Sequence, residues 1–72
     1  MFPSEYINRG QCTFTTTSVS LWSDTHHSKN LNNIPCGHVQ NAYWQGNTVH
    51  VIMEDGWHYV YQDFGGYASK WR

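Results

Sequence analysis

Apolar and polar side chains alternate along the second half of the chain, with the period of two that is typical of β-strands. The alternation is clearest over residues 48–54 and 57–62, which are separated only by Asp55-Gly56. Asp-Gly between two such segments predicts a β-hairpin with a two-residue type I′ turn. Strands are also expected at residues 38–44 and 67–71, so this half of the chain predicts a meander.

The first half of the chain carries a single expected strand. Residues 13–22 are rich in Thr, Ser and Val and favour a strand, whereas residues 23–33 are polar and predict a long surface loop. Residues 1–12 have no hydrophobic period and are expected to form an extended N-terminal arm or a short flanking strand. No window has helical spacing. We therefore predict an all-β domain over residues 13–72, a small five-stranded barrel with a long loop after its first strand.

The two-residue turn sets the expected register of the central hairpin, with Val51 opposite Val60. One face is then aliphatic and is expected to be the core: Val49, Val51, Met53 and Val60. The other face is aromatic and polar and is expected to be half exposed: His50, Ile52, Trp57, Tyr59 and Tyr61. We therefore predict an aromatic face on the outside of the sheet, with Trp57 pointing outward and Val60 inward.

Charge and hydropathy argue against two classes of partner. Lys plus Arg number 4 and Asp plus Glu number 5, which gives a formal net charge of -1. No basic stripe is therefore available to neutralise nucleic-acid phosphates. No apolar run approaches the roughly 18 residues of a membrane span, and the first residues lack the pattern of a signal peptide. We expect neither a nucleic-acid partner nor a membrane partner.

The two cysteines leave the cellular compartment open. A disulfide between Cys12 and Cys36 would close a loop of about 25 residues and contribute about 3–4 kcal/mol on the chain-entropy model. Such a bond would favour an extracytoplasmic or secreted location, whereas two reduced thiols would suit the cytosol. Neither cysteine belongs to a Cys-x-x-Cys motif, so redox and zinc-ribbon functions are not indicated.

Neither catalysis nor a metal centre is predicted. The chain has five histidines, but His26 and His27 are adjacent, and the register above places His50 and His58 on opposite faces. The Asp residues that follow strands are explained by hydrogen bonding within turns. A barrel of this size offers no second lobe to form a cleft. We therefore expect a non-catalytic protein without a metal or other cofactor.

Four short segments follow one another along residues 13–72 in an order that resembles that of a known family. They are Val19-Ser20-Leu21-Trp22-Ser23-Asp24, Ile34-Pro35-Cys36-Gly37-His38-Val39, Asp55-Gly56-Trp57-His58-Tyr59-Val60 and Gly66-Tyr67-Ala68-Ser69-Lys70-Trp71. In this order they resemble the bacterial SH3 domains, a family of SH3-like barrels whose pattern includes a Gly-Trp pair entering a strand and a Gly-aromatic-small closing strand. Ser20 and Trp22 replace the Asn and Arg of the family's first motif, and the segment from Gly37 to Trp57 is longer than usual.

The resemblance implies a ligand groove bordered by the indole of Trp57. Its walls are expected to come from other aromatic side chains: Trp22, Tyr43, Trp44, Tyr59 and Tyr61. The function that follows is a non-catalytic module that recognises an extended peptide, either a cell-wall peptide or a segment of a partner protein. Two alternatives stay open: a free-standing inhibitor or immunity protein of phage or secretion-system type, and an oligomer that buries the aromatic face against a copy of itself.

Overall fold

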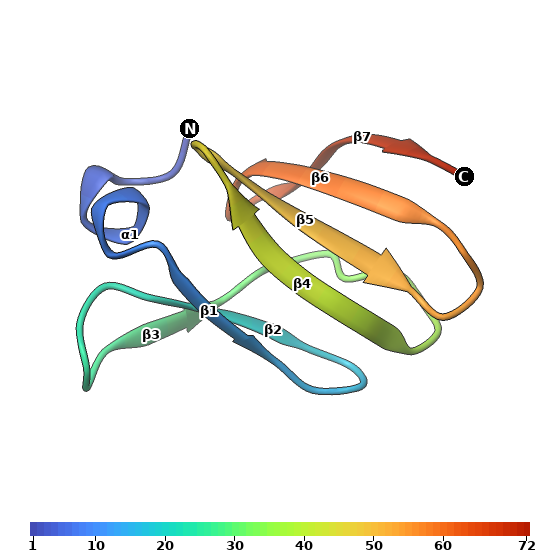
Figure 1. Ribbon diagram of the computed structural model, residues 1–72, viewed down its shortest axis with the longest axis horizontal. Coiled ribbons are helices and arrows are strands. Elements are labelled where there is room, and N and C mark those ends of the chain that lie inside the picture. Colours follow the sequence, from blue (N-terminus) through green and yellow to red (C-terminus); the bar gives the residue numbers. More distant parts are fainter.

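The computed structural model describes residues 1–72 as two antiparallel β-sheets packed against each other (Figure 1). A short helix, α1 (Ser4–Arg9), precedes the first sheet, which contains β1 (Gln11–Phe14), β2 (Val19–Trp22) and β3 (Ser28–Asn30). The second sheet is a meander of β4 (Val39–Gln45), β5 (Thr48–Met53), β6 (His58–Asp63) and β7 (Gly66–Trp71). The all-β prediction is confirmed. The chain has seven strands in two sheets that do not close into a barrel, where five barrel strands were predicted.

The segment that the sequence predicted as one strand forms two strands of the first sheet, β1 and β2. Residues 15–18 form a tight turn between β1 and β2, in which the Thr15 N–H donates to the Ser18 carbonyl at 2.8 Å. The hydroxyls of the same two residues also hydrogen-bond at 2.8 Å. Thr and Ser favour strands but can also close turns through their hydroxyls, so composition alone did not reveal this hairpin. The predicted long loop likewise contains β3, which pairs with β2.

The N-terminal segment is helical rather than extended. Pro3 precedes α1, and Gly10 ends it in the left-handed region with φ 61°. This order, Pro at the start and Gly just past the end, is a helix signal that does not depend on hydrophobic periodicity. Before the helix, the side chain of Phe2 is only 1% exposed and belongs to the core. Phe2 thus anchors the N-terminal segment to the core, and residues 11–12 begin β1, which pairs with β2 as the short flanking strand that was one of the two expectations.

The core lies between the two sheets. Val19 and Leu21 enter it from β2, and Phe2 closes one end by edge contacts with Trp44 and Phe64 at 5.2 and 5.1 Å between ring centroids. The β4–β7 sheet contributes most of the remaining core side chains: Val39, Ala42, Val49, Val51, Met53, Tyr59 and Tyr61. We call the side of this sheet that carries these residues its inner face and the opposite side its outer face.

The β5–β6 hairpin has a three-residue loop and not the predicted two-residue turn. The Met53 N–H donates to the Trp57 carbonyl at 2.9 Å, and the Gly56 N–H donates to the Met53 carbonyl at 3.1 Å. Gly56 has φ 97°, a left-handed conformation that this loop class needs and that glycine adopts without strain. The extra loop residue shifts the pairing by one, so Val51 lies opposite Tyr59.

A shift of one residue exchanges the two faces of a strand, and three predictions that involve β6 are therefore wrong. Tyr59 and Tyr61 lie on the inner face, 8% and 0% exposed, where an exposed aromatic face was predicted. Val60 points to the outer face, opposite His50 of β5 and Ser69 of β7. It is buried there, at 8% exposed, as predicted, but it lies outside the core between the sheets. His58 accompanies Val60 there, so His50 and His58 share one face and do not lie on opposite faces.

Candidate binding site

Strand β7 forms a free edge of the second sheet. It pairs with β6 on one side, and no strand pairs with its other side. Four large hydrophobic residues of the chain are exposed, and two of them, Tyr67 (42%) and Trp71 (47%), lie on β7. A strand edge with unpaired backbone groups and exposed aromatic side chains is a template for pairing with another extended chain.

The turn before β7 is fixed by hydrogen bonds on both sides. Asp63 accepts the Gly65 N–H at 2.8 Å through Oδ1, and Asn33 donates from Nδ2 to the Gly65 carbonyl at 2.6 Å. A Cβ on Gly66 would lie 3.2 Å from Asn33 Nδ2, so the close approach of this loop favours glycine there. The double Gly therefore lets the chain reverse tightly enough to bring β7 against β6.

The outer face carries one ring from each strand of the sheet. We call this set, which consists of Tyr43, His50, His58 and Trp71, the aromatic row. Tyr43 stacks on His50 with centroids 5.3 Å apart, His50 meets His58 edge to face at 4.8 Å, and His58 stacks on Trp71 at 4.2 Å. Tyr43 and the two histidines are half-buried, and Trp71 is exposed at the β7 end. Each ring is thus held in place by its neighbour.

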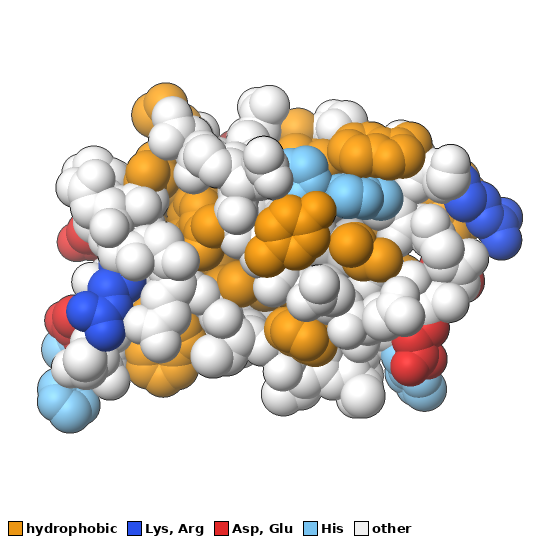
Figure 2. Space-filling model, in the orientation of Figure 1, with side chains coloured by type: hydrophobic (Ala, Val, Ile, Leu, Met, Phe, Trp, Pro, Cys, Tyr) orange, Lys and Arg blue, Asp and Glu red, His pale blue; other side chains and the backbone are white.

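The surroundings of the aromatic row are polar but uncharged. By the strand pairing, the outer-face positions of β4–β7 hold no Asp, Glu, Lys or Arg. In Figure 2 histidine and hydrophobic side chains lie side by side over this sheet, whereas most charged side chains in view lie toward the two ends. The outer face therefore suits uncharged ligand groups or, through imidazole nitrogens, a metal ion.

A direct hydrogen bond joins the two histidines of the row. Nδ1 of His50 and Nε2 of His58 are 2.6 Å apart, so one ring nitrogen donates and the other accepts. Burial lowers the pKa of His50, and the neighbouring His58 lowers it further. Both effects favour the uncharged imidazole, because burial and a like charge each penalise the protonated form.

The inner side of β7 is cationic and aromatic. The Lys70 ammonium lies 5.3 Å from the ring centre of Trp57, and the Arg72 guanidinium lies 5.4 Å from the same ring. Tyr67 packs edge to face on Tyr59 at 4.9 Å. These cations account for two of the four Lys and Arg residues in the chain, so the region around Trp57 is the most basic part of the sheet edge.

The structure does not assemble the predicted groove, because the six residues chosen for it fall in different places. Trp57 is half-buried on the inner face beside buried Tyr59. Tyr43 lies on the opposite, outer face. The predicted outward orientation of Trp57 is therefore wrong, because its ring lies on the inner face and packs against the core, although the side chain stays partly exposed.

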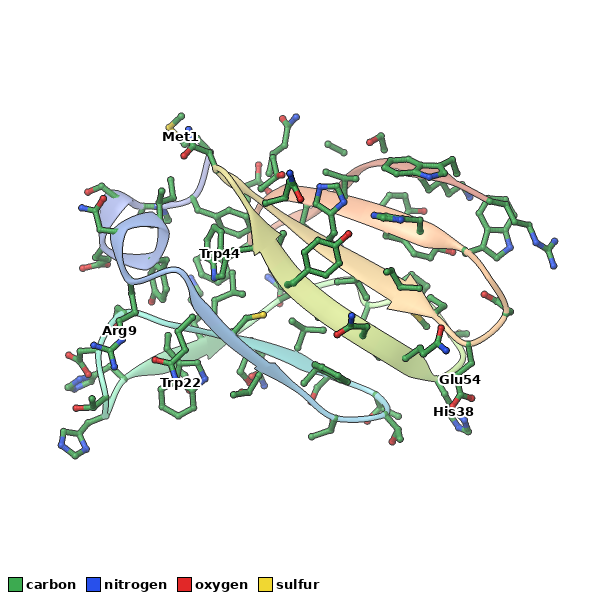
Figure 3. All side chains as sticks on the ribbon, viewed as in Figure 1. Met1, Arg9, Trp22, His38, Trp44 and Glu54 are labelled. Carbon is green, nitrogen blue, oxygen red and sulfur yellow. The ribbon has the colours of Figure 1, made fainter.

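The remaining three residues of the predicted groove have structural partners. Tyr61 is fully buried and donates its hydroxyl to the Asn33 carbonyl at 3.0 Å. Trp22 donates Nε1 to the Thr13 hydroxyl at 3.0 Å and points away from the β4–β7 sheet (Figure 3). Trp44 lies between α1 and β4 and packs against Phe2, with its Nε1 buried and without a hydrogen-bond partner (Figure 3).

The two cysteines are free thiols, so the disulfide considered from the sequence is not formed. Cys12 on β1 donates its thiol to the Ala42 carbonyl of β4 at 3.3 Å, while Cys36 is exposed in the loop before β4. Burial raises the pKa of the Cys12 thiol. Cys12 is half-buried, and the raised pKa favours its protonated thiol, which is a weaker nucleophile than the thiolate.

The structure contains no cluster of three or more His, Cys, Asp or Glu side chains arranged around one point. A shallow cavity of about 270 Å³ lies at the far end of the outer face and is lined by Met1, Asn47, Thr48 and Gln62. It contains no acid, base or nucleophile suited to catalysis. No helix of the chain is both long and apolar enough to span a membrane.

Sequence reasoning missed the aromatic row because the row depends on the register of the β5–β6 hairpin. With a two-residue turn, His50 and His58 separate; with the three-residue loop, they meet. The sequence does contain a signal for the second arrangement, because Glu54-Asp55-Gly56 fits a three-residue loop that ends in a left-handed glycine.

Comparison of the chain with protein-family models, curated proteins and solved structures gave no match.

Proposed function

We propose that this chain is a non-catalytic binding module that takes up an extended peptide as an additional strand along β7. The observation that carries the proposal is the free edge of β7 with an exposed aromatic ring on each face, Trp71 on the outer face and Tyr67 on the inner. Main-chain hydrogen bonds supply affinity in this mode of recognition, and side-chain contacts on alternating positions supply specificity.

The two faces of β7 favour different side chains in the bound peptide. Successive residues of a strand point to opposite faces, so alternate peptide side chains would meet Trp71 and then Tyr67 with Lys70. The outer face is uncharged and favours an apolar or neutral polar residue. On the inner side the Lys70 ammonium favours an acidic residue, because opposite charges on neighbouring strands stabilise their pairing. The preferred peptide thus alternates neutral and acidic positions.

Trp71 is the expected anchor of this interaction. Its indole stacks on His58 at 4.2 Å between centroids, and the aromatic row continues from His58 to β4. A ring that is already held in one orientation loses little entropy when a ligand packs on it. Large rings of this kind often dominate binding energy when the ligand excludes water around them.

The resemblance to bacterial SH3 domains supports a peptide over other ligands of the same shape. The closing motif of that resemblance is the segment that forms β7, and the Gly-Trp motif supplies Trp57 beside Lys70. We regard the two packed sheets as an open variant of the SH3-like architecture. Folds of this type serve several functions, so the choice between a cell-wall peptide and a segment of a protein partner depends on the ligand test below.

The proposal is tested by selecting ligands from a random decapeptide display library and, separately, by retention on purified peptidoglycan. Peptides that bind wild-type protein should lose roughly tenfold or more in affinity for Trp71→Ala. Phe14→Ala is the matched control, since Phe14 is 41% exposed on β1 and lies away from β7. Loss of binding in both variants, or in neither, would contradict the proposal.

The two ligand sources give different results. Retention on peptidoglycan that is lost in Trp71→Ala assigns the module to the cell wall. Selection of peptides without retention on peptidoglycan assigns it to a protein partner, including the single target expected of an inhibitor or immunity protein. Failure of the wild-type protein to bind in both assays would contradict peptide recognition itself.

A further inference from the structure

The His50–His58 contact places two ligand nitrogens at one point on the protein surface. Nδ1 of His50 and Nε2 of His58 face each other at 2.6 Å, and the two rings are nearly perpendicular at 81°. Neutral imidazole is a favoured ligand for Zn²⁺ and for related divalent transition metals. The arrangement therefore has the ligand type and the proximity of two ligand nitrogens that a two-histidine metal site requires.

Neighbouring rings hold both imidazoles in this orientation. Tyr43 lies against His50 with 14° between the ring planes, and Trp71 lies against His58 with 21° between them. Both histidines project from paired strands, β5 and β6, and both are half-buried. Ligands fixed by packing on regular strands bind more tightly than ligands on mobile loops, because less side-chain freedom is lost on binding.

Metal binding requires the two rings to separate and to rotate, so that both lone pairs point at the ion. Zn–N bonds of about 2.0–2.1 Å at a tetrahedral angle place two ligand nitrogens roughly 3.3 Å apart. The two rings must therefore separate somewhat from their hydrogen-bonded distance of 2.6 Å. The outer-face positions of the sheet carry no Lys or Arg that would repel the cation. Solvent or a ligand group would occupy the remaining coordination positions on the open side.

Two histidine–carboxylate pairs elsewhere in the chain are less suited to binding a metal ion. His27 lies 2.9 Å from Asp24, and His38 lies 3.3 Å from Glu54. The four side chains of these pairs are 54–76% exposed. No aromatic ring stacks on these histidines, whereas both histidines of the row have a stacked neighbour. They serve as internal controls for nonspecific binding.

We propose that His50 and His58 form a two-histidine site for Zn²⁺ on the outer face of the β4–β7 sheet. The ion would replace the hydrogen bond between the rings and leave open positions toward solvent. Because His58 stacks on Trp71, separation of the two imidazoles also moves or loosens the contact with that indole. The site does not depend on peptide binding at β7, so each proposal can fail without the other.

The test is a titration of the full chain with ZnCl₂, followed by calorimetry and by NMR of the histidine ring protons. One saturable site should appear, and the ring protons of His50 and His58 should shift while those of His26, His27 and His38 change little. His50→Asn and His58→Gln retain an amide near the ligand nitrogen, and each should weaken Zn²⁺ binding by roughly tenfold or more. MgCl₂ should give no saturable binding, since Mg²⁺ prefers oxygen ligands.

His27→Gln and His38→Gln are the matched controls and should bind Zn²⁺ as the wild type does. Three results would overturn the site: no saturable binding by the wild-type chain, unchanged affinity in His50→Asn or His58→Gln, or an equal loss in the control variants. If either site variant fails to fold, the wild-type NMR titration decides, because it identifies the histidines that contact the ion.

Discussion

Val51 lies opposite Tyr59 across the β5–β6 hairpin, and this single pairing decides which side chains face the core. It buries Tyr59 and Tyr61 on the inner face and brings His50 and His58 together on the outer face. The pairing follows from the three-residue loop that ends at Gly56. The aromatic row therefore depends on this loop.

Substitution of Gly56 tests the left-handed conformation that this loop requires. Gly56→Ala should lower the free energy of unfolding by about 1 kcal/mol or more, because alanine is strained at a φ of 97°. Gly56→Asn should cost less, since asparagine tolerates left-handed conformations better than alanine does. Urea denaturation of the three proteins measures the difference. Equal stability of Gly56→Ala and the wild type would contradict the loop assignment.

The aromatic anchor of the N-terminal segment is Phe2. Phe2→Ala should destabilise the protein by about 3–5 kcal/mol, because the side chain is 1% exposed and contacts two other rings. Met1→Ala is the neighbouring control; Met1 is 82% exposed, so the change should stay within about 0.5 kcal/mol. Thermal unfolding followed by circular dichroism provides the comparison. Similar midpoints for both variants would show that residues 1–12 do not pack as described.

Tyr61 makes stability fall at alkaline pH. Burial, with smaller contributions from Tyr67 and Tyr59, raises the pKa of Tyr61 to about 12, compared with about 10 for an unperturbed tyrosine. The raised pKa means that the folded state holds the phenol proton more strongly than the unfolded state. This stabilisation is fully present below about pH 10 and is lost as the pH rises toward 12.

The variant Tyr61→Phe separates this effect from general alkaline denaturation. It removes the hydrogen bond to the Asn33 carbonyl and should cost about 1 kcal/mol at neutral pH. Its stability should then fall less steeply than that of the wild type between about pH 10 and pH 12. Tyr43→Phe, on the opposite face of the sheet and not among the groups that raise the pKa of Tyr61, should retain the wild-type slope. The same steep slope in Tyr61→Phe would show that another group causes the alkaline loss.

The free chain should be a monomer at low micromolar concentration. β7 carries Lys70, and a charged side chain on an edge strand disfavours pairing of two identical edges. Static light scattering measures the mass directly. A persistent dimer that dissociates in Trp71→Ala would assign the edge and its aromatic rings to self-association, as the oligomer hypothesis holds, and would remove β7 from peptide binding.

Much of the second sheet could be predicted from sequence, because alternation over residues 38–71 is a direct consequence of its one-sided burial. The predicted strands agree with β4 to β7 within one or two residues. The strand predictions that failed depended on the position or length of a turn. The β1–β2 turn has no Gly, Pro or Asn to mark it, and the β5–β6 loop differs from the predicted turn by one residue.

The helix α1 was missed for a different reason. Its six residues are too few to display a hydrophobic period, and its position is indicated only by Pro3 and Gly10 at the two ends. The predicted set of binding residues was the least accurate prediction, because every side chain of a strand changes face when the register shifts by one residue. Trp57 was chosen for its motif and retains partial exposure, whereas Trp71, the exposed ring on the edge strand, was treated only as part of a closing strand.

Amide hydrogen exchange along β7 tests the peptide proposal most directly. In the free protein, backbone amides of β7 that point away from β6 have no strand partner and should exchange rapidly. With a peptide selected from the decapeptide library bound at saturation, these outward amides should become protected, while the amides of β1 to β3 should change little. Protection confined to another strand, or unchanged exchange along β7 in the saturated complex, would contradict the central claim.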